Sequence, residues 1–181
     1  PMIYPGVTAI VRDENKGIAF SRNQGFQLST GDYILFVDAD DMLAENFLEE
    51  MMAQERWYKP DVVYPSAILL ARWGDSKLDN GYFVPPHTLK LSDMAKQNYV
   101  LVTSLIKREV YEKVGGFNPD LSIFEDYEFF LKAMLIGYKF VRANCCLRYR
   151  QRTLSRNRSN ESSKERIYNQ IRNSVLKDVN I

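Results

Sequence analysis

The sequence has little cysteine and no long apolar run. Only two of its 181 residues are cysteines, and because Cys145 and Cys146 are adjacent they cannot form a disulfide framework. A reducing compartment such as the cytoplasm is therefore the expected location. No apolar stretch approaches the roughly 20 residues that a membrane-spanning helix requires. The first residues also lack the basic and then apolar segment that is typical of a secretory signal.

The chain as a whole has almost no net charge. It carries 24 Lys and Arg against 23 Asp and Glu, and 45% of its residues are hydrophobic. These values are ordinary for a globular protein and exclude a disordered chain, which would need low hydrophobicity and high net charge. At roughly 100–200 residues per domain, the length predicts a single domain with a short appendage. We place the domain at 1–158 and a C-terminal amphipathic helix at 159–181.

The charges are unevenly distributed along the chain. Residues 142–172 hold nine basic and two acidic side chains, whereas residues 1–141 have a net charge of −6. A concentrated basic segment indicates an anionic partner: a phosphate group, a nucleic acid or an anionic membrane surface. A solvated, charged terminal helix explains the same pattern equally well.

Strands and helices are predicted to alternate, which indicates an α/β domain. Strands are expected at 7–11, 33–37, 61–64, 68–73 and 100–107, with one or two more within 140–150. Helices are expected at 18–28, 44–57, 92–97, 109–114 and 126–136, and from 162 onward. Residues 74–91 are rich in Gly, Pro, Asp and Asn and are expected to form a long loop with at most a short hairpin. The continuous apolar run 33–37 is typical of a strand buried on both faces of a parallel sheet.

Three carboxylates follow that apolar run directly, in the order Asp38-Ala39-Asp40-Asp41. Ligands of open parallel sheets bind beyond the carboxyl ends of the strands. Asp38 and Asp40 point the same way in an extended chain, so they could hold Mg²⁺ or Mn²⁺ together with substrate phosphates. Two alternatives remain open at this point. Asp40 or Asp41 could cap the next helix, or Asp38 could be the nucleophile of a Mg²⁺-dependent aspartyl phosphatase.

Three further motifs could carry chemistry. Glu125-Asp126 opens a predicted helix, where acids are favoured by the helix dipole but could also supply a general base. Gly115-Gly116-Phe117 could stop a helix and anchor the core, or let the backbone approach a ligand closely. Arg22, which precedes Asn23, is either an exposed helical residue or a partner for phosphate.

Taken together, the motifs resemble those of family 2 glycosyltransferases over about residues 7–155. The matching segments are Asn15-Lys16-Gly17-Ile18-Ala19, Ser21-Arg22-Asn23-Gln24-Gly25, Gly31 to Asp41, Gly115-Gly116-Phe117 and Glu125-Asp126-Tyr127. Members are inverting enzymes with the GT-A fold, a Rossmann-like, mostly parallel sheet flanked by helices. The resemblance begins at what corresponds to the family's third strand. An N-terminally truncated GT-A fold, without the first strand–helix–strand unit, is therefore expected.

The resemblance implies roles for the donor and metal residues. Asp40 would ligate Mn²⁺ or Mg²⁺, and Asp38 would contact the donor's ribose or share the metal. Arg22 and Asn23 would contact the nucleotide part of the donor. The family often has His where Arg152 stands, so a metal-binding role is lost at that position. Arg150 and Arg152 could instead bind the diphosphate or face an anionic acceptor.

The resemblance also implies the reaction and its partners. Asp126 would be the catalytic base, with Glu125 beside it, and Gly115-Gly116-Phe117 would border the pocket for the sugar and acceptor. The donor would be a nucleotide-sugar, foremost a UDP-sugar, and the acceptor a saccharide or a lipid-linked molecule, as in surface polysaccharide synthesis. No nucleic-acid partner is implied, while peripheral contact with the inner face of a membrane and homo-oligomers are compatible with it. A non-catalytic module that binds sugar nucleotides is the remaining alternative.

Overall fold

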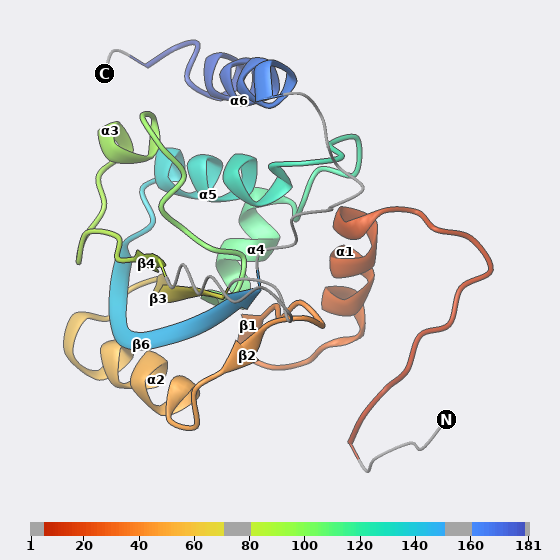
Figure 1. The fold of residues 1–181 in the computed structure, drawn as a ribbon, viewed down its shortest axis with the longest axis vertical. Helices are drawn as coiled ribbons and strands as arrows, with labels where there is room; N and C mark the ends of the chain where they lie inside the picture. Colours follow the sequence, from red (N-terminus) through yellow and green to blue (C-terminus); the bar gives the residue numbers. More distant parts are fainter. Residues whose placement is uncertain (1–5, 71–80, 151–160, 180–181) are drawn as a thin grey trace.

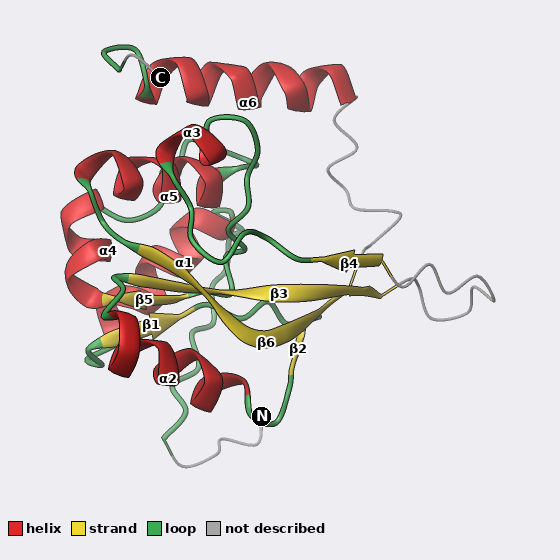
Figure 2. Cartoon of the chain, turned by 90° about the vertical axis from the view of Figure 1, so that its left-hand side faces the viewer, coloured by secondary structure: helices red, strands yellow, loops and turns green. Residues whose placement is uncertain are grey.

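The computed structural model describes residues 6–70, 81–150 and 161–179, with all their side chains except those of residues 69, 70, 149, 150 and 161 (Figure 1). The predicted roles of Arg152 and of the Arg150 side chain therefore concern groups outside the described residues. One mixed sheet forms the centre, and helices cover both of its faces (Figure 2). The α/β class that the alternating pattern predicts is confirmed.

Six strands form the sheet within the described residues, in the order β1-β5-β3-β6-β2, with β4 paired to β3 outside this path. Their bounds are Tyr33–Leu35 (β1), Met42–Leu43 (β2), Val62–Leu70 (β3), Gly81–Phe83 (β4), Leu105–Lys107 (β5) and Phe140–Arg150 (β6). Only β3 and β6 pair in parallel, and the other described pairings are antiparallel. The expectation of mostly parallel pairing is therefore wrong, because antiparallel β5 lies between β1 and β3, which run in the same direction.

The strand before the acidic motif differs from the expectation. β1 is shorter than 33–37 and pairs antiparallel with β5 at one end of the path, not within a parallel sheet. Ile34 is buried, but Tyr33 and Leu35 are only partly covered. The predicted strand at 7–11 is also wrong. That segment has no strand partner among the described residues, and the side chain of Val11 is 89% exposed.

Other strand boundaries changed through tertiary pairing. The strand expected at 61–64 and the described part of the one expected at 68–73 form one strand, β3, whose register with β6 shifts between Tyr64 and Ser66. Residues 71–73 lie outside the described residues. Pro65 lies at this irregularity, which is where a sheet tolerates a residue without a backbone N–H. Only Leu105–Lys107 of the expected strand 100–107 is extended, and β6 is one continuous strand. The short strand β2 has no counterpart among the expected elements.

The helices follow the predicted pattern closely. They are Ile18–Leu28 (α1), Phe47–Tyr58 (α2), Leu91–Met94 (α3), Arg108–Val114 (α4), Glu125–Ile136 (α5) and Glu161–Val175 (α6). Both α4 and α5 end at a glycine in the left-handed conformation, Gly115 (φ +90°) and Gly137 (φ +106°). Glycine adopts this conformation without a steric penalty, and it is the usual stop for a helix.

Alternation along β3 divides the core into two layers. Val62 and Tyr64 face the cluster built with α4 and α5, whereas Val63 and Ala67 face the cluster under α2. Successive side chains of a strand point to opposite faces, so a single strand supplies both cores. Figure 2 shows α2 on one side of the sheet and α3, α5 and α6 on the other.

The C-terminal helix α6 packs on α5. The Tyr168 ring stacks on that of Tyr127 at a centroid distance of 4.2 Å, and Ile171 is buried in the same cluster. The amphipathic helix expected at this end of the chain therefore covers an apolar face of the domain. None of the described helices is long and apolar enough to cross a membrane.

Candidate functional site

One pocket of about 450 Å³ collects charged residues that lie far apart in the sequence. Its walls come from the start of α1, the turn after β1, the loop before β5, the start of α5, β6 and the start of α6. The charged lining residues are Asp38, Asp41, Glu125, Asp126, Arg22 and Lys164. The predicted acidic motifs thus meet in one pocket, although almost 90 residues separate them in the sequence.

Arg22 connects the two acidic motifs. Its Nη2 donates to Asp38 Oδ1 at 2.8 Å and its Nη1 donates to Glu125 Oε1 at 2.6 Å. The Arg22 and Glu125 side chains are each only 9% exposed, and the guanidinium lies 5.6 Å from the centroid of the Phe117 ring. A planar guanidinium can serve two carboxylates at once. Arg22 therefore fixes the distance between the turn after β1 and the start of α5.

Asn23 ties the glycine motif to α1. Its Oδ1 accepts from the Phe117 N–H at 2.9 Å and from the Tyr111 hydroxyl at 2.6 Å, and its Nδ2 donates to the Phe117 carbonyl at 2.8 Å. Gly116 has φ +77°, and a Cβ there would lie 2.8 Å from Asn23 Oδ1. These hydrogen bonds hold the Phe117 ring against Arg22. Asn23, Gly115, Gly116 and Phe117 thus form a layer behind the pocket wall.

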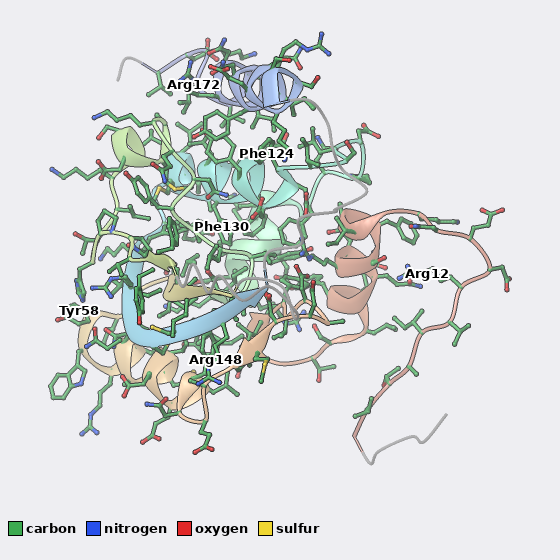
Figure 3. All side chains as sticks on the ribbon, viewed as in Figure 1. Arg12, Tyr58, Phe124, Phe130, Arg148 and Arg172 are labelled. Carbon is green, nitrogen blue, oxygen red and sulfur yellow. The ribbon has the colours of Figure 1, made fainter. Side chains whose placement is uncertain are left out.

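The start of α5 presents Asp126 to the pocket. Phe124, the N-cap residue of α5, has a left-handed backbone (φ 63°), an uncommon conformation for a bulky residue. Its ring packs edge-on against Tyr168, between α5 and α6 (Figure 3). Burial and the neighbouring charge of Glu125 raise the pKa of Asp126 to about 6. The hydrogen bond from the Tyr127 N–H and the positive charge of Arg22 lower this pKa, but by less. A carboxyl with this pKa is suited to accept a proton near neutral pH.

The acidic motif after β1 forms a turn. The backbone N–H of Asp41 donates to the carbonyl of Asp38 at 3.0 Å, so the chain is not extended and the alternation expected for Asp38 and Asp40 does not apply. Asp38 and Asp41 line the pocket. The N-cap of α2 is Asn46, so the expectation that Asp40 or Asp41 caps that helix is wrong.

The metal expected at this turn can be judged from its oxygen donors. Within the described ranges, no three His, Cys, Asp or Glu side chains are arranged to hold a metal ion. Asp38 uses Oδ1 for Arg22, and its side chain is 33% exposed. Mg²⁺ is commonly held by one or two carboxylates together with substrate phosphates and water. The carboxylate oxygens of the turn fit such an ion, and the phosphates of a bound substrate would supply further ligands to it.

The pocket also contains residues that were not expected there. Lys164 of α6 lines it, and so does Thr103, whose buried hydroxyl has no hydrogen-bond partner among the described residues. A sequence signal for Lys164 exists, because it precedes Tyr168, Ile171 and Val175 at helical spacings of four, three and four. These three residues pack against the domain. No local signal distinguished Thr103.

Comparisons with known proteins identify the family. The sequence model of the family described as "Glycosyl transferase family 2" matches residues 2–115, which includes Arg22 and the acidic turn but ends before Glu125. An uncharacterized glycosyltransferase of Haemophilus influenzae is 28% identical over 137 residues, covering 71% of this chain and 44% of that protein. YwdF, an uncharacterized glycosyltransferase of Bacillus subtilis, is 26% identical over 150 residues, covering 79% of this chain and 54% of that protein. The chain thus spans about half the length of these relatives.

Solved structures agree with this assignment at the level of the fold. S. aureus TarS 1–349 in complex with UDP-GlcNAc superposes with a TM-score of 0.67 at 14% identity, covering 94% of this chain and 50% of that one. The same protein in complex with UDP gives a TM-score of 0.63 at 17% identity, covering 92% and 47%. The expected GT-A class is therefore confirmed, and with more than half of its residues matching the family model, the chain belongs to glycosyl transferase family 2.

Proposed function

We propose that this chain carries the catalytic pocket of an inverting glycosyltransferase, which moves a sugar from a nucleotide-sugar to a hydroxyl acceptor. The observation that carries the proposal is the ion-pair bridge of Arg22, which brings the acidic turn and the Glu125-Asp126 pair to one pocket. The acidic turn suits a cation with its diphosphate, and the Glu125-Asp126 pair supplies a proton acceptor. Direct sugar transfer needs both close to one reacting carbon, the cation site beside the donor's diphosphate and the base beside the acceptor hydroxyl.

The proposed reaction is a single displacement. The acceptor oxygen forms a bond to the anomeric carbon while the bond from that carbon to the diphosphate oxygen breaks, and its electron pair leaves with the diphosphate. The hydroxyl proton passes to the Asp126 carboxylate. Because one displacement takes place, the anomeric configuration inverts. The raised pKa of Asp126, about 6, leaves the group deprotonated and sufficiently basic at neutral pH.

Asp38, which lines the pocket, and Asp40 of the same turn, which is not among the lining residues, would hold the Mn²⁺ or Mg²⁺ ion that the family resemblance implies. When bound, such an ion offsets the negative charge that develops on the leaving diphosphate. Arg22 keeps Asp38 in place through its bond to Oδ1, so that Oδ2 could ligate the ion. Thr103 lines the same pocket, and its hydroxyl, which has no partner among the described residues, would be available to a polar substrate group.

The donor is proposed to be a UDP-sugar, which the complexes of TarS with UDP and with UDP-GlcNAc support. The acceptor class is proposed to be a saccharide or lipid-linked molecule. Its support is that a minor teichoic acid biosynthesis protein of Bacillus subtilis is 25% identical over 130 residues, covering 68% of this chain and 14% of that protein. The family assignment leaves no support for an aspartyl phosphatase.

The test compares Asp126→Asn with the wild-type chain for UDP binding and for sugar transfer or hydrolysis of UDP-sugars. We expect Asp126→Asn to bind UDP with unchanged affinity and to lose roughly 100-fold or more of its turnover, because general-base catalysis contributes about 10²–10⁴-fold. Asp120→Asn, at an exposed acid of the preceding loop, is the matched control. Equal turnover in wild type and Asp126→Asn would refute the base assignment. UDP binding without any turnover by the wild type would favour the non-catalytic module.

A further inference from the structure

The start of α6 contributes one charged residue to the pocket, Lys164, and neither the motifs nor the family comparison assigns it a role. Its side chain is half-buried at the pocket wall. Among the described residues no carboxylate forms an ion pair with it, whereas Arg22 already pairs with both Asp38 and Glu125. A lysine in this position keeps its charge available for a ligand.

Aromatic packing holds Lys164 in place. Tyr168, one helical turn further along α6, stacks on Tyr127 and packs edge-on against Phe124 at a centroid distance of 5.9 Å. Phe124 and Tyr127 flank the Glu125-Asp126 pair directly in sequence. The same contacts that seat α6 therefore place Lys164 at a fixed position relative to the proposed base.

The charge balance of the pocket shows what Lys164 can do. Four carboxylates line the pocket, and two of them share Arg22. A diphosphate entering beside Glu125 and Asp126 would be repelled, since like charges a few ångströms apart cost energy in a partly desolvated site. An ammonium group in the same pocket offsets this repulsion. The main charges acting on Asp126 are Glu125 and Arg22, so Lys164 is not the partner of the base.

We propose that Lys164 binds the diphosphate of the nucleotide-sugar and makes α6 part of the donor site. This inference rests on the proposed function and adds to it a phosphate-binding residue that belongs to the C-terminal helix. The ammonium would donate to phosphate oxygens in the bound donor and in the released nucleoside diphosphate. The acidic turn would then hold the cation, and α6 would contact the diphosphate through Lys164.

The experiment measures the affinity of wild type, Lys164→Met and Lys164→Arg for UDP and for uridine, which has the same base without phosphates. We expect Lys164→Met to bind UDP roughly 10- to 100-fold more weakly, the range for loss of a hydrogen bond to a charged group. Its affinity for uridine should stay unchanged, and Lys164→Arg should recover most of the UDP affinity. Arg166→Met, at an exposed cation of the same helix, should behave as wild type.

Each other outcome overturns the inference in a recognisable way. Unchanged UDP affinity in Lys164→Met would remove Lys164 from the donor site and leave the proposed function intact. An equal loss of UDP and uridine binding would show that Lys164 only supports the fold of the pocket. A wild-type chain that binds neither UDP nor UDP-sugars would refute the proposed function together with this inference.

Discussion

Arg22 and Glu125 are joined by a 2.6 Å ion pair that spans 103 residues of sequence, and both side chains are almost fully buried. The pair links α1 to the first turn of α5 and is completed by Asp38. Buried ion pairs contribute little net stability relative to apolar replacements, but breaking one leaves a charge without its partner in a low-dielectric site. This relationship yields the first prediction.

Arg22→Met should lower the free energy of unfolding by about 3–5 kcal/mol, because it leaves the Glu125 carboxylate buried without its partner. Urea denaturation at pH 7 measures the effect. Lys132→Met removes the pair between a partly exposed lysine and Glu128, which keeps a hydrogen bond from Asn118, and should cost only about 1 kcal/mol. The double variant Arg22→Met with Glu125→Gln should recover part of the loss. A double variant as unstable as the sum of both single variants would contradict the role of the unpaired charge.

Gly116→Ala should be clearly more destabilising than Gly115→Ala. Both glycines have positive φ angles, +77° and +90°, so each alanine carries a similar backbone strain of about 1–3 kcal/mol. A Cβ at Gly115 meets no atom within 4 Å, whereas at Gly116 it would lie 2.8 Å from Asn23 Oδ1. The difference between the two variants in thermal unfolding therefore reports the clash with Asn23. Equal melting temperatures of Gly116→Ala and Gly115→Ala would contradict the close contact between Gly116 and Asn23.

The pH dependence of stability should report Asp126. Its pKa is raised from 3.8 to about 6 in the folded chain, so the folded state holds this proton more tightly than the unfolded state does. The resulting stabilisation is fully present below about pH 4 and is lost as the pH rises through 6. The side chain at position 126 does not titrate in the Asp126→Asn variant. Relative to that of wild type, the free energy of unfolding of this variant should therefore rise by up to about 3 kcal/mol between pH 4 and 7. Denaturation curves at several pH values measure the difference.

The same titration predicts the pH profile of the proposed reaction. Turnover should rise as the pH increases through about 6, because only the deprotonated Asp126 carboxylate can accept a proton. Measurement of the turnover number from pH 4.5 to 8 at saturating donor tests this. A profile that is flat from pH 5 to 7 would assign proton transfer to another group.

Removal of the divalent cation should abolish turnover, and Asp40→Asn should raise the Mn²⁺ concentration needed for half-maximal activity. Loss of a residue in a metal's outer shell alone commonly costs roughly 10- to 100-fold in affinity, and loss of a ligand should cost at least as much. Titration of Mn²⁺ in the presence of UDP measures this, with Glu45→Gln, at an acid between β2 and α2, as the control. Full activity in a chelator would contradict the proposed metal role of Asp38 and Asp40.

Much of the local structure was predictable because it depends on nearby residues. The apolar spacing of Phe47, Leu48, Met51 and Met52 predicts α2 to within a few residues, and Gly115 and Gly137 end their helices as expected. The acidic turn and the Glu125-Asp126 pair were also recognisable, since both stand at the ends of strongly patterned segments.

Strand pairing was less predictable, because it depends on neighbours that are distant in sequence. The apolar runs 7–11 and 33–37 have similar local signals, yet only the second finds a partner, β5, among the described residues. Likewise, β3 continues through Pro65 because β6 runs alongside it on both sides of the shift in register.

The amino-acid sequence by itself indicated the helices to within a few residues, the acidic motifs and the family, because the helices and motifs depend on residue types at short spacing and the family on the order of those motifs. Only the tertiary structure decided that Arg22 pairs with Glu125, that Asn23 clamps Phe117 and that Lys164 reaches the pocket of Asp126. Side chains that are distant in sequence come together only when a shared core is buried. For this reason, the composition of the pocket follows from the packing of α1, α5 and α6 around the sheet.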